Sequence, residues 1–225
     1  ADLLVENYNG TSTLPTATGN NATAIGVGAT AGGNYSFAAG QSASTAGNNT
    51  IALGSFAVVT AGNAVALGMS SSAGGIGAVS IGDSVAESTA SVAIGQLAYA
   101  STSTRATAMP ASRASGVDSF AVAIGSNSSS YGASGSNSIA MGQLSKATQA
   151  NSIAIGDTAI STTANQIALG GATDTVKISG TYTLPTADGT ANQVLTTDGS
   201  GAVTFADAGG GITTGKAIAM AMVFG

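Results

Sequence analysis

The stretch Thr50-Ile51-Ala52-Leu53-Gly54 is a short apolar run that ends at a glycine, and the same pattern recurs along most of the chain. Most of the terminal glycines are 14 residues apart, and a fixed period of this kind is typical of a stacked repeat. The 30-residue step from Gly95 to Gly125 equals two turns if Pro110 takes the glycine position of a degenerate copy. The copies end at Gly26, Gly40, Gly54, Gly68, Gly82, Gly95, Gly125, Gly142, Gly156 and Gly170.

Each copy predicts a β-strand with two different faces. Large apolar residues stand one and three positions before the glycine, and alanine usually stands between them, as in Ile51, Ala52 and Leu53. This alternation indicates a strand, whereas the frequent glycines and Ser/Thr/Asn clusters exclude a helix. A second alternating run follows each glycine. Each repeat therefore predicts one coil of a parallel β-solenoid, and ten steps at about 4.8 Å predict a rod of about 48 Å over residues 21–171.

A 14-residue coil is flat, with room inside for alanine and serine but not for a layer of valine and isoleucine. We therefore expect Ala52 and its equivalents inside the coil, opposite Ala43, Ala57, Ala98 and Ala159 of the second run. The large residues then form an outward stripe, which soluble chains avoid unless other copies cover it around a symmetry axis. The residues expected to line that axis are Ile51, Leu53, Val65, Leu67, Val92, Ile94, Ile153, Ile155, Ile167 and Leu169.

The repeats resemble the head repeats of trimeric autotransporter adhesins (YadA-like heads). Ser91-Val92-Ala93-Ile94-Gly95 and Ser152-Ile153-Ala154-Ile155-Gly156 carry the resemblance, which extends over about residues 21–171. It implies an all-β, left-handed parallel β-roll assembled as a tight homotrimer.

Two breaks in the period predict surface loops, because insertions in solenoids map to loops. They span residues 101–118 and 126–137. Arg105, Arg113 and Tyr131 are therefore candidates for receptor contact, with ordinary loop residues as the alternative. In the coil that ends at Gly125, the count predicts Val122 and Ile124 outward and Ala123 inside.

The remaining segments divide the chain into an N-terminal attachment segment (1–20), a β-hairpin module (172–208), and a glycine linker with an apolar tail (209–225). Residues 182–205 resemble a module common in bacteriophage tail-fibre and virion proteins, and the tail resembles the C-termini of marine phage structural proteins. The tail presents a candidate docking face of Ile218, Met220, Met222 and Phe224. We expect it either to dock the trimer onto the particle or the next fibre component, or to fold back and cap the last coil.

Composition excludes several classes of function. The 225 residues include no Cys or His, which rules out His- or Cys-based nucleophile systems and His/Cys metal sites, so we expect no cofactor and no catalytic site. The net charge of −5 argues against nucleic-acid binding. No apolar run is long enough to span a membrane as a helix, and the first residues lack the pattern of a signal peptide.

Together these features indicate a structural, non-enzymatic trimeric fibre on the surface of a phage virion, attached to other virion proteins and contacting a host glycan or protein. The head of a bacterial surface adhesin is the alternative. A carbohydrate-degrading fibre enzyme is disfavoured, because Asp83 and Glu87 form the only close carboxylate pair within the repeats.

Overall fold

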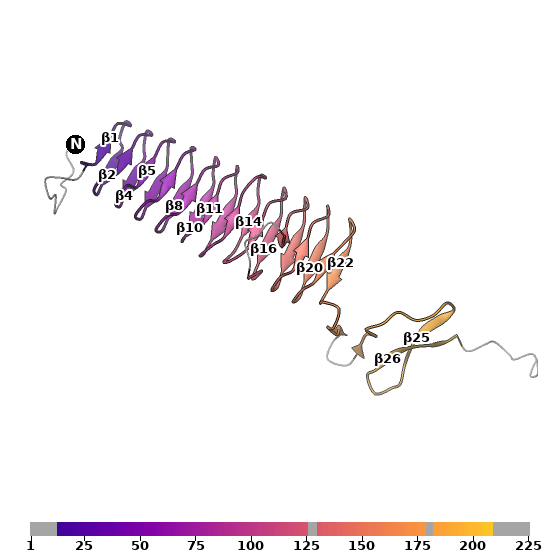
Figure 1. Ribbon diagram of the computed structural model, residues 1–225. Helices are drawn as coiled ribbons and strands as arrows, with labels where there is room; N and C mark the ends of the chain where they lie inside the picture. Colours follow the sequence, from indigo (N-terminus) through magenta and orange to yellow (C-terminus); the bar gives the residue numbers. More distant parts are fainter. Residues whose placement is uncertain (1–12, 126–129, 179–181, 209–225) are drawn as a thin grey trace, which may run out of the picture. The chain divides into compact units, whose positions relative to one another are not determined.

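The structure is a computed structural model, and it describes residues 13–125, 130–178 and 182–208 (Figure 1). It divides into two units, one up to Gly171 and one from Ala172 onward. Within these described ranges the regular elements are all strands. The four tail residues predicted to dock, Ile218, Met220, Met222 and Phe224, lie outside the described residues.

The first unit is a parallel β-solenoid of two sheets with eleven strands each. Strands alternate between the sheets along the chain, so each coil contributes one strand to each sheet (Figure 1). The even-strand sheet contains β2 (Thr23–Ile25), β4 (Phe37–Ala39), β6 (Ile51–Leu53), β8 (Val65–Leu67), β10 (Val79–Ile81), β12 (Val92–Ile94), β14 (Thr107–Ala108), β16 (Phe120–Val122), β18 (Ile139–Met141), β20 (Ile153–Ile155) and β22 (Ile167–Leu169). The odd-strand sheet contains β1 (Thr16–Ala17), β3 (Thr30–Ala31), β5 (Ser44–Thr45), β7 (Val58–Val59), β9 (Ser72–Ala73), β11 (Val85–Ala86), β13 (Tyr99–Ala100), β15 (Arg113–Ala114), β17 (Gly132–Ala133), β19 (Lys146–Ala147) and β21 (Ile160–Ser161).

Strand register follows the sequence period. Ile51 pairs with Val65 and Leu53 with Leu67, so equivalent residues of successive copies stack on one another. The degenerate copy also stacks as predicted, because Ala108 of β14 pairs with Ala93 of β12. A Cβ added to Gly95 would lie 2.3 Å from the Cγ of Pro110, which places Pro110 over the glycine position. The odd-strand sheet begins at Thr16, within the segment predicted to precede the roll, since β1 pairs with β3.

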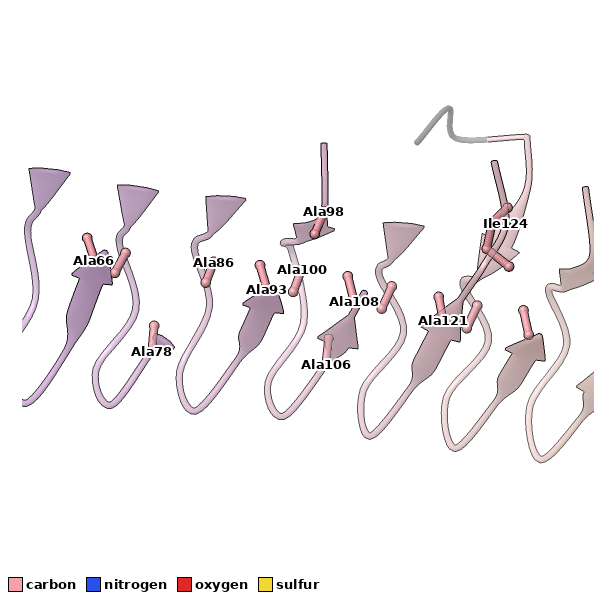
Figure 2. Packing of buried hydrophobic residues seen from close by; sticks show 14 of the residues in the cluster. Ala66, Ala78, Ala86, Ala93, Ala98, Ala100, Ala106, Ala108, Ala121 and Ile124 are labelled. Carbon is pink, nitrogen blue, oxygen red and sulfur yellow. The ribbon is translucent and has the colours of Figure 1, made fainter. Parts of the chain in front are cut away.

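The interior of the coils consists mainly of alanine and serine, as predicted (Figure 2). Ala52, Ala43, Ala57, Ala98 and Ala159 are all at most 1% exposed. Buried serines at the start of many even strands donate to a backbone carbonyl three residues earlier, which satisfies their hydroxyls inside a narrow core.

The sequence predicts no layer of valine and isoleucine inside the coils, and the described coils contain such residues only singly. Val59 and Ile124 are both fully buried (Figure 2 shows Ile124 among the core alanines). Val59 lies between Thr45 and Ala73 in the odd-strand ladder. A single valine therefore fits inside a coil whose neighbour on one side has the smaller alanine at the same position. A complete layer of such residues is absent from the described coils.

The turns explain the glycine period. Gly54 has φ of 138°, which residues with a Cβ rarely adopt, and an added Cβ would lie 2.3 Å from the carbonyl oxygen of Gly68 in the next coil. The opposite turn uses asparagine in the left-handed region, which asparagine tolerates better than most residues. There Asn137 donates to Asn151 at 3.0 Å, and Asn151 donates to Asn165 at 3.1 Å.

The predicted register of the coil before the second break is wrong by two residues. Strand β16 contains Phe120 and Val122 as its outward residues and Ala121 inside, and Ala121 pairs with Ala140. Ala123, predicted inside, takes the glycine position with φ of 56°, and Ile124, predicted outward, is buried. A shift of two residues leaves the alternation of faces unchanged, so the pattern alone could not distinguish the two registers.

The second unit contains two antiparallel pairs. Strands β23 (Lys177–Ile178) and β24 (Tyr182–Thr183) form one pair, and β25 (Gln193–Thr197) and β26 (Val203–Asp207) form the predicted hairpin. The carboxylate of Asp198 stabilises the connecting turn by accepting a hydrogen bond from the backbone N–H of Ser200 at 2.7 Å.

Candidate functional surfaces

The outer face of the even-strand sheet carries two parallel apolar rows that run the length of the solenoid. All ten residues predicted to line a symmetry axis lie in these rows, and the paired registers keep each row continuous from coil to coil. One row contains Phe37, Ile51, Val65, Val79, Val92, Phe120, Ile139, Ile153 and Ile167, together with Thr23 and Thr107, and the other contains Ile25, Leu53, Leu67, Ile81, Ile94, Val122, Met141, Ile155 and Leu169, together with Ala39.

In a single chain this face remains open to solvent. Leu53 is 48% exposed and Ile167 is 63% exposed, although both are large apolar residues. Residues in the middle of the rows, such as Val65 and Val92, are half-buried because their neighbours above and below cover their sides. A large, predominantly apolar surface of this kind marks an interaction site on a soluble protein.

The outer face of the odd-strand sheet has a different character. Its outward positions contain small, polar, charged and apolar residues without a continuous stripe. In coil order from β1 they are Thr16, Thr30, Ser44, Val58, Ser72, Val85, Tyr99, Arg113, Gly132, Lys146 and Ile160. The two broad faces of the solenoid are therefore chemically distinct.

Arg105 lies at a turn, where it pairs with Asp118 of the next coil. Its Nη2 donates to Oδ2 of Asp118 at 2.7 Å, and both residues have positive φ, as the asparagines do at the equivalent turns. The hydrogen bond from Arg105 lowers the pKa of the Asp118 carboxyl, while partial desolvation opposes that shift. Arg105 is thus already engaged with a partner from its own chain.

Arg113 and Tyr131 occupy different environments. Arg113 lies on the outer face of β15, and its guanidinium carbon is 4.5 Å from the ring centre of Tyr99. Tyr131 is half-buried and packs against the alanine core. The three residues predicted as receptor contacts therefore do not form one cluster: Arg105 is at a turn, Arg113 on a face, and Tyr131 against the interior.

Sequence reasoning did not single out Tyr99 or Lys146, which share the outer row with Arg113. The signal that could have found them is their common position, four residues after the glycine position in their own coils. Tyr99 stands four residues after Gly95 and Lys146 four after Gly142. Arg113 stands only three residues after Pro110, because that turn is one residue shorter.

The described residues contain no group of three Asp or Glu side chains that could hold a metal ion. No helix in the described part of the chain is long and apolar enough to cross a membrane.

A family model described as "YadA head domain repeat (2 copies)" matches residues 17–43, 31–57, 46–71 and 133–159. These matches begin at successive coils near the N-terminal end of the solenoid and resume after the lengthened turn that follows β16. A search of curated proteins found no match. The chain thus carries repeats similar to those of YadA heads over these residues, all within the solenoid.

Proposed function

We propose that the chain forms a homotrimeric attachment rod, with the three even-strand sheets facing a common axis. The observation that carries this proposal is the pair of apolar rows on the outer face of that sheet, which a single chain leaves exposed. Three copies around an axis cover all three stripes at once and leave the three odd-strand sheets facing outward. The match to YadA head repeats supports the same assembly.

The setting proposed for this rod is the surface of a phage particle, where it serves as a fibre that contacts the host. Support comes from the second unit, most of whose β25–β26 hairpin lies in the segment that resembles a module of tail-fibre and virion proteins. In this setting the other partners are neighbouring virion proteins and a glycan or protein on the host surface.

The head of a bacterial surface adhesin is a second candidate, and the YadA head repeats favour it. The trimeric rod is common to both settings, which differ in whether the rod is attached to a phage particle or to a bacterial surface.

Sedimentation velocity of the purified chain tests the assembly, and immunogold microscopy with an antibody to the roll tests the setting. We expect a trimer, with label on phage particles. A stable, folded monomer would overturn the trimer, and label confined to bacterial envelopes would replace the phage setting with the adhesin.

A further inference from the structure

The two rows on the even-strand sheet depart from a uniform pattern at two coils. The first row, which contains Ile51, has two aromatic residues, Phe37 of β4 and Phe120 of β16. In the second row, Ala39 and Val122 are the smallest residues, and the other paired positions carry isoleucine, leucine or methionine. Each of these small residues belongs to the same strand as one of the phenylalanines. The largest side chains of one row therefore lie beside the smallest of the other.

The strand geometry places each large and small residue next to one another on the outer face. Residues two apart on a strand point to the same face, so Phe37 and Ala39 stand side by side with buried Ala38 between them on the inside. Ala39 is only 8% exposed, whereas Leu53, at the equivalent position of the next coil, is 48% exposed. The short alanine thus lies below the level of its larger neighbours.

The bulk of the two residues is balanced within the strand. Phenylalanine and alanine together have as many side-chain carbon atoms as isoleucine and leucine, which β6 carries at the same positions. In β16 the second residue is valine, so the balance is partial there. Both phenylalanines also pair with a threonine in the preceding coil, Thr23 and Thr107, whose side chain is shorter than that of isoleucine.

This balance indicates what covers the face. The ladders run through the solenoid without a missing strand, so the coils keep a spacing of about 4.8 Å and cannot move apart singly. A rigid, repeating partner leaves similar room over every coil, and a close-packed interface tolerates neither extra volume nor a void. A lipid surface or a flexible peptide adapts to local shape and requires no such balance. The same face of other copies of this chain is a rigid surface with the matching repeat.

We infer that the layers of Phe37 with Ala39 and of Phe120 with Val122 set the axial register in which the copies pack. In that register every layer along the axis contains the same coil of each chain. This inference rests on the proposed trimer and adds to it the residues that align the three chains.

The other coils specify register only weakly. Because the pattern repeats, a slip by one coil still brings isoleucine, valine and leucine together over most of the rod. The same slip places Phe37 of one chain against Ile51 and Leu53 of another, where it adds volume, and leaves space beside Ala39. In the even-strand order β16 is six strands beyond β4, so every shorter slip misplaces both phenylalanine layers.

Replacing Ala39 with leucine tests the balance. The change makes the face more apolar, so it would strengthen the association of a face that is only adhesive, but it overfills the Phe37 layer. We expect the full-length Ala39→Leu chain to dissociate at concentrations about tenfold or more above those of the wild type in sedimentation velocity. Adding Phe37→Ile recreates the Ile-Ala-Leu sequence of β6 and should restore wild-type association.

A second layer and a matched control complete the series. Val122→Leu, alone and with Phe120→Ile, repeats the test in β16, and circular dichroism checks the folding of each variant. If Ala39→Leu does not fold, the β16 pair decides the result. Ala46→Leu makes the same change at an exposed position outside the two rows and should associate as the wild type does.

Cysteine cross-linking reads the register itself, because the chain has no native cysteine. Leu67→Cys chains are mixed with tagged Ile81→Cys chains, whose cysteine lies one coil further along the second row. Aligned chains form disulfides between equal positions, and a slip by one coil forms disulfides between positions 67 and 81. We expect equal-position disulfides in the otherwise wild-type chain. Unequal disulfides should rise severalfold when both phenylalanine strands are changed to Ile-Ala-Leu.

The outcomes separate this inference from the proposed function. Association of Ala39→Leu and Val122→Leu as tight as that of the wild type, or double variants that do not recover, would overturn the balance. Mainly unequal disulfides in the wild-type background, or no rise in the doubly changed chain, would overturn the register. Either result with a trimeric wild type leaves the proposed assembly intact, whereas a wild type that is not trimeric overturns that assembly.

Discussion

Replacing Ile153 with aspartate tests the assembly most directly. Ile153 lies in the outward row of β20, next to the interior residue Ala154, and it is half-buried in a single chain. In an isolated chain the new carboxylate faces water and leaves the coil interior unchanged. In the proposed trimer, three such carboxylates meet at an apolar axis without cationic partners among the neighbouring row residues Ile139 and Ile167.

The size of the effect follows from the pKa of the new carboxyl. An exposed aspartate has a pKa of about 3.9, and burial in apolar surroundings raises the pKa by up to about 3 to 5 units. Each unit corresponds to about 1.36 kcal/mol, so a rise of about three units in three protomers disfavours the trimer by about 12 kcal/mol at pH 7. Because the trimer binds these protons more tightly than the monomer does, its association weakens as pH rises above about 3.9 and recovers as pH falls toward that value.

Sedimentation velocity at pH 7 and pH 4, with circular dichroism to check folding, measures this outcome. The matched control is Ile160→Asp, which places the same change on the outer face of β21, where Ile160 is 49% exposed. We expect the wild type and the Ile160 variant to be trimeric at both pH values, and the Ile153 variant to be monomeric at pH 7 and to reassociate toward pH 4. A trimeric Ile153 variant at pH 7, or dissociation caused by the Ile160 change, would refute the assignment of the two faces.

Three further changes probe the coil, the turn and the ion pair. Ala93→Leu should overfill the interior and lower the free energy of unfolding by about 1–3 kcal/mol in urea titrations, while the outward Val92→Leu should leave the single chain's stability nearly unchanged. Gly142→Ala should destabilise the roll, because Gly142 has φ of 119° and the new Cβ would lie 2.5 Å from the carbonyl oxygen of Gly156. Gly77 has φ of 68° and open space around its Cβ position, so Gly77→Asn should be neutral or raise the free energy of unfolding by up to about 1 kcal/mol in the same titrations. In an NMR pH titration the Asp118 carboxyl should show a pKa below its ordinary value of 3.8, and in Arg105→Gln this pKa should move back toward 3.8. The stabilisation by this ion pair is present above the ordinary pKa and is lost as pH falls through the lowered pKa of Asp118.

Much of the fold could be predicted because one physical rule repeats in every coil. Where the step is 14 residues, as from Ala52 to Ala66, the glycine position, the inward alanine and the two outward residues are all set by the same short pattern. The Pro110 coil could be placed for the same reason, since only one spacing kept it in step with its neighbours.

The coil containing Ala123 could not be placed, because two registers satisfy the alternation equally well. What decides between them is packing that sequence spacing does not describe: Ile124 fills the interior, and its backbone N–H bonds to the hydroxyl of buried Ser112 at 3.2 Å. The sequence also does not show that Arg113 and Lys146 lie two coils apart in the same outer row. This placement depends on where the extra residues of the lengthened turn lie, and residue spacing alone does not reveal that.

The structure locates those extra residues in a single turn. Ala114 pairs with Ala133 in one sheet and Ala121 pairs with Ala140 in the other, so both ladders continue across the insertion without a missing strand. The added length must therefore lie after β16 and before β17, where Gly132 begins the return strand. A change of length or sequence in this turn alters the outer face of the odd-strand sheet while the apolar rows of the even-strand sheet keep their register. The fold thereby separates the sheet proposed for assembly from the sheet proposed to face outward, and the second can vary without loss of the first.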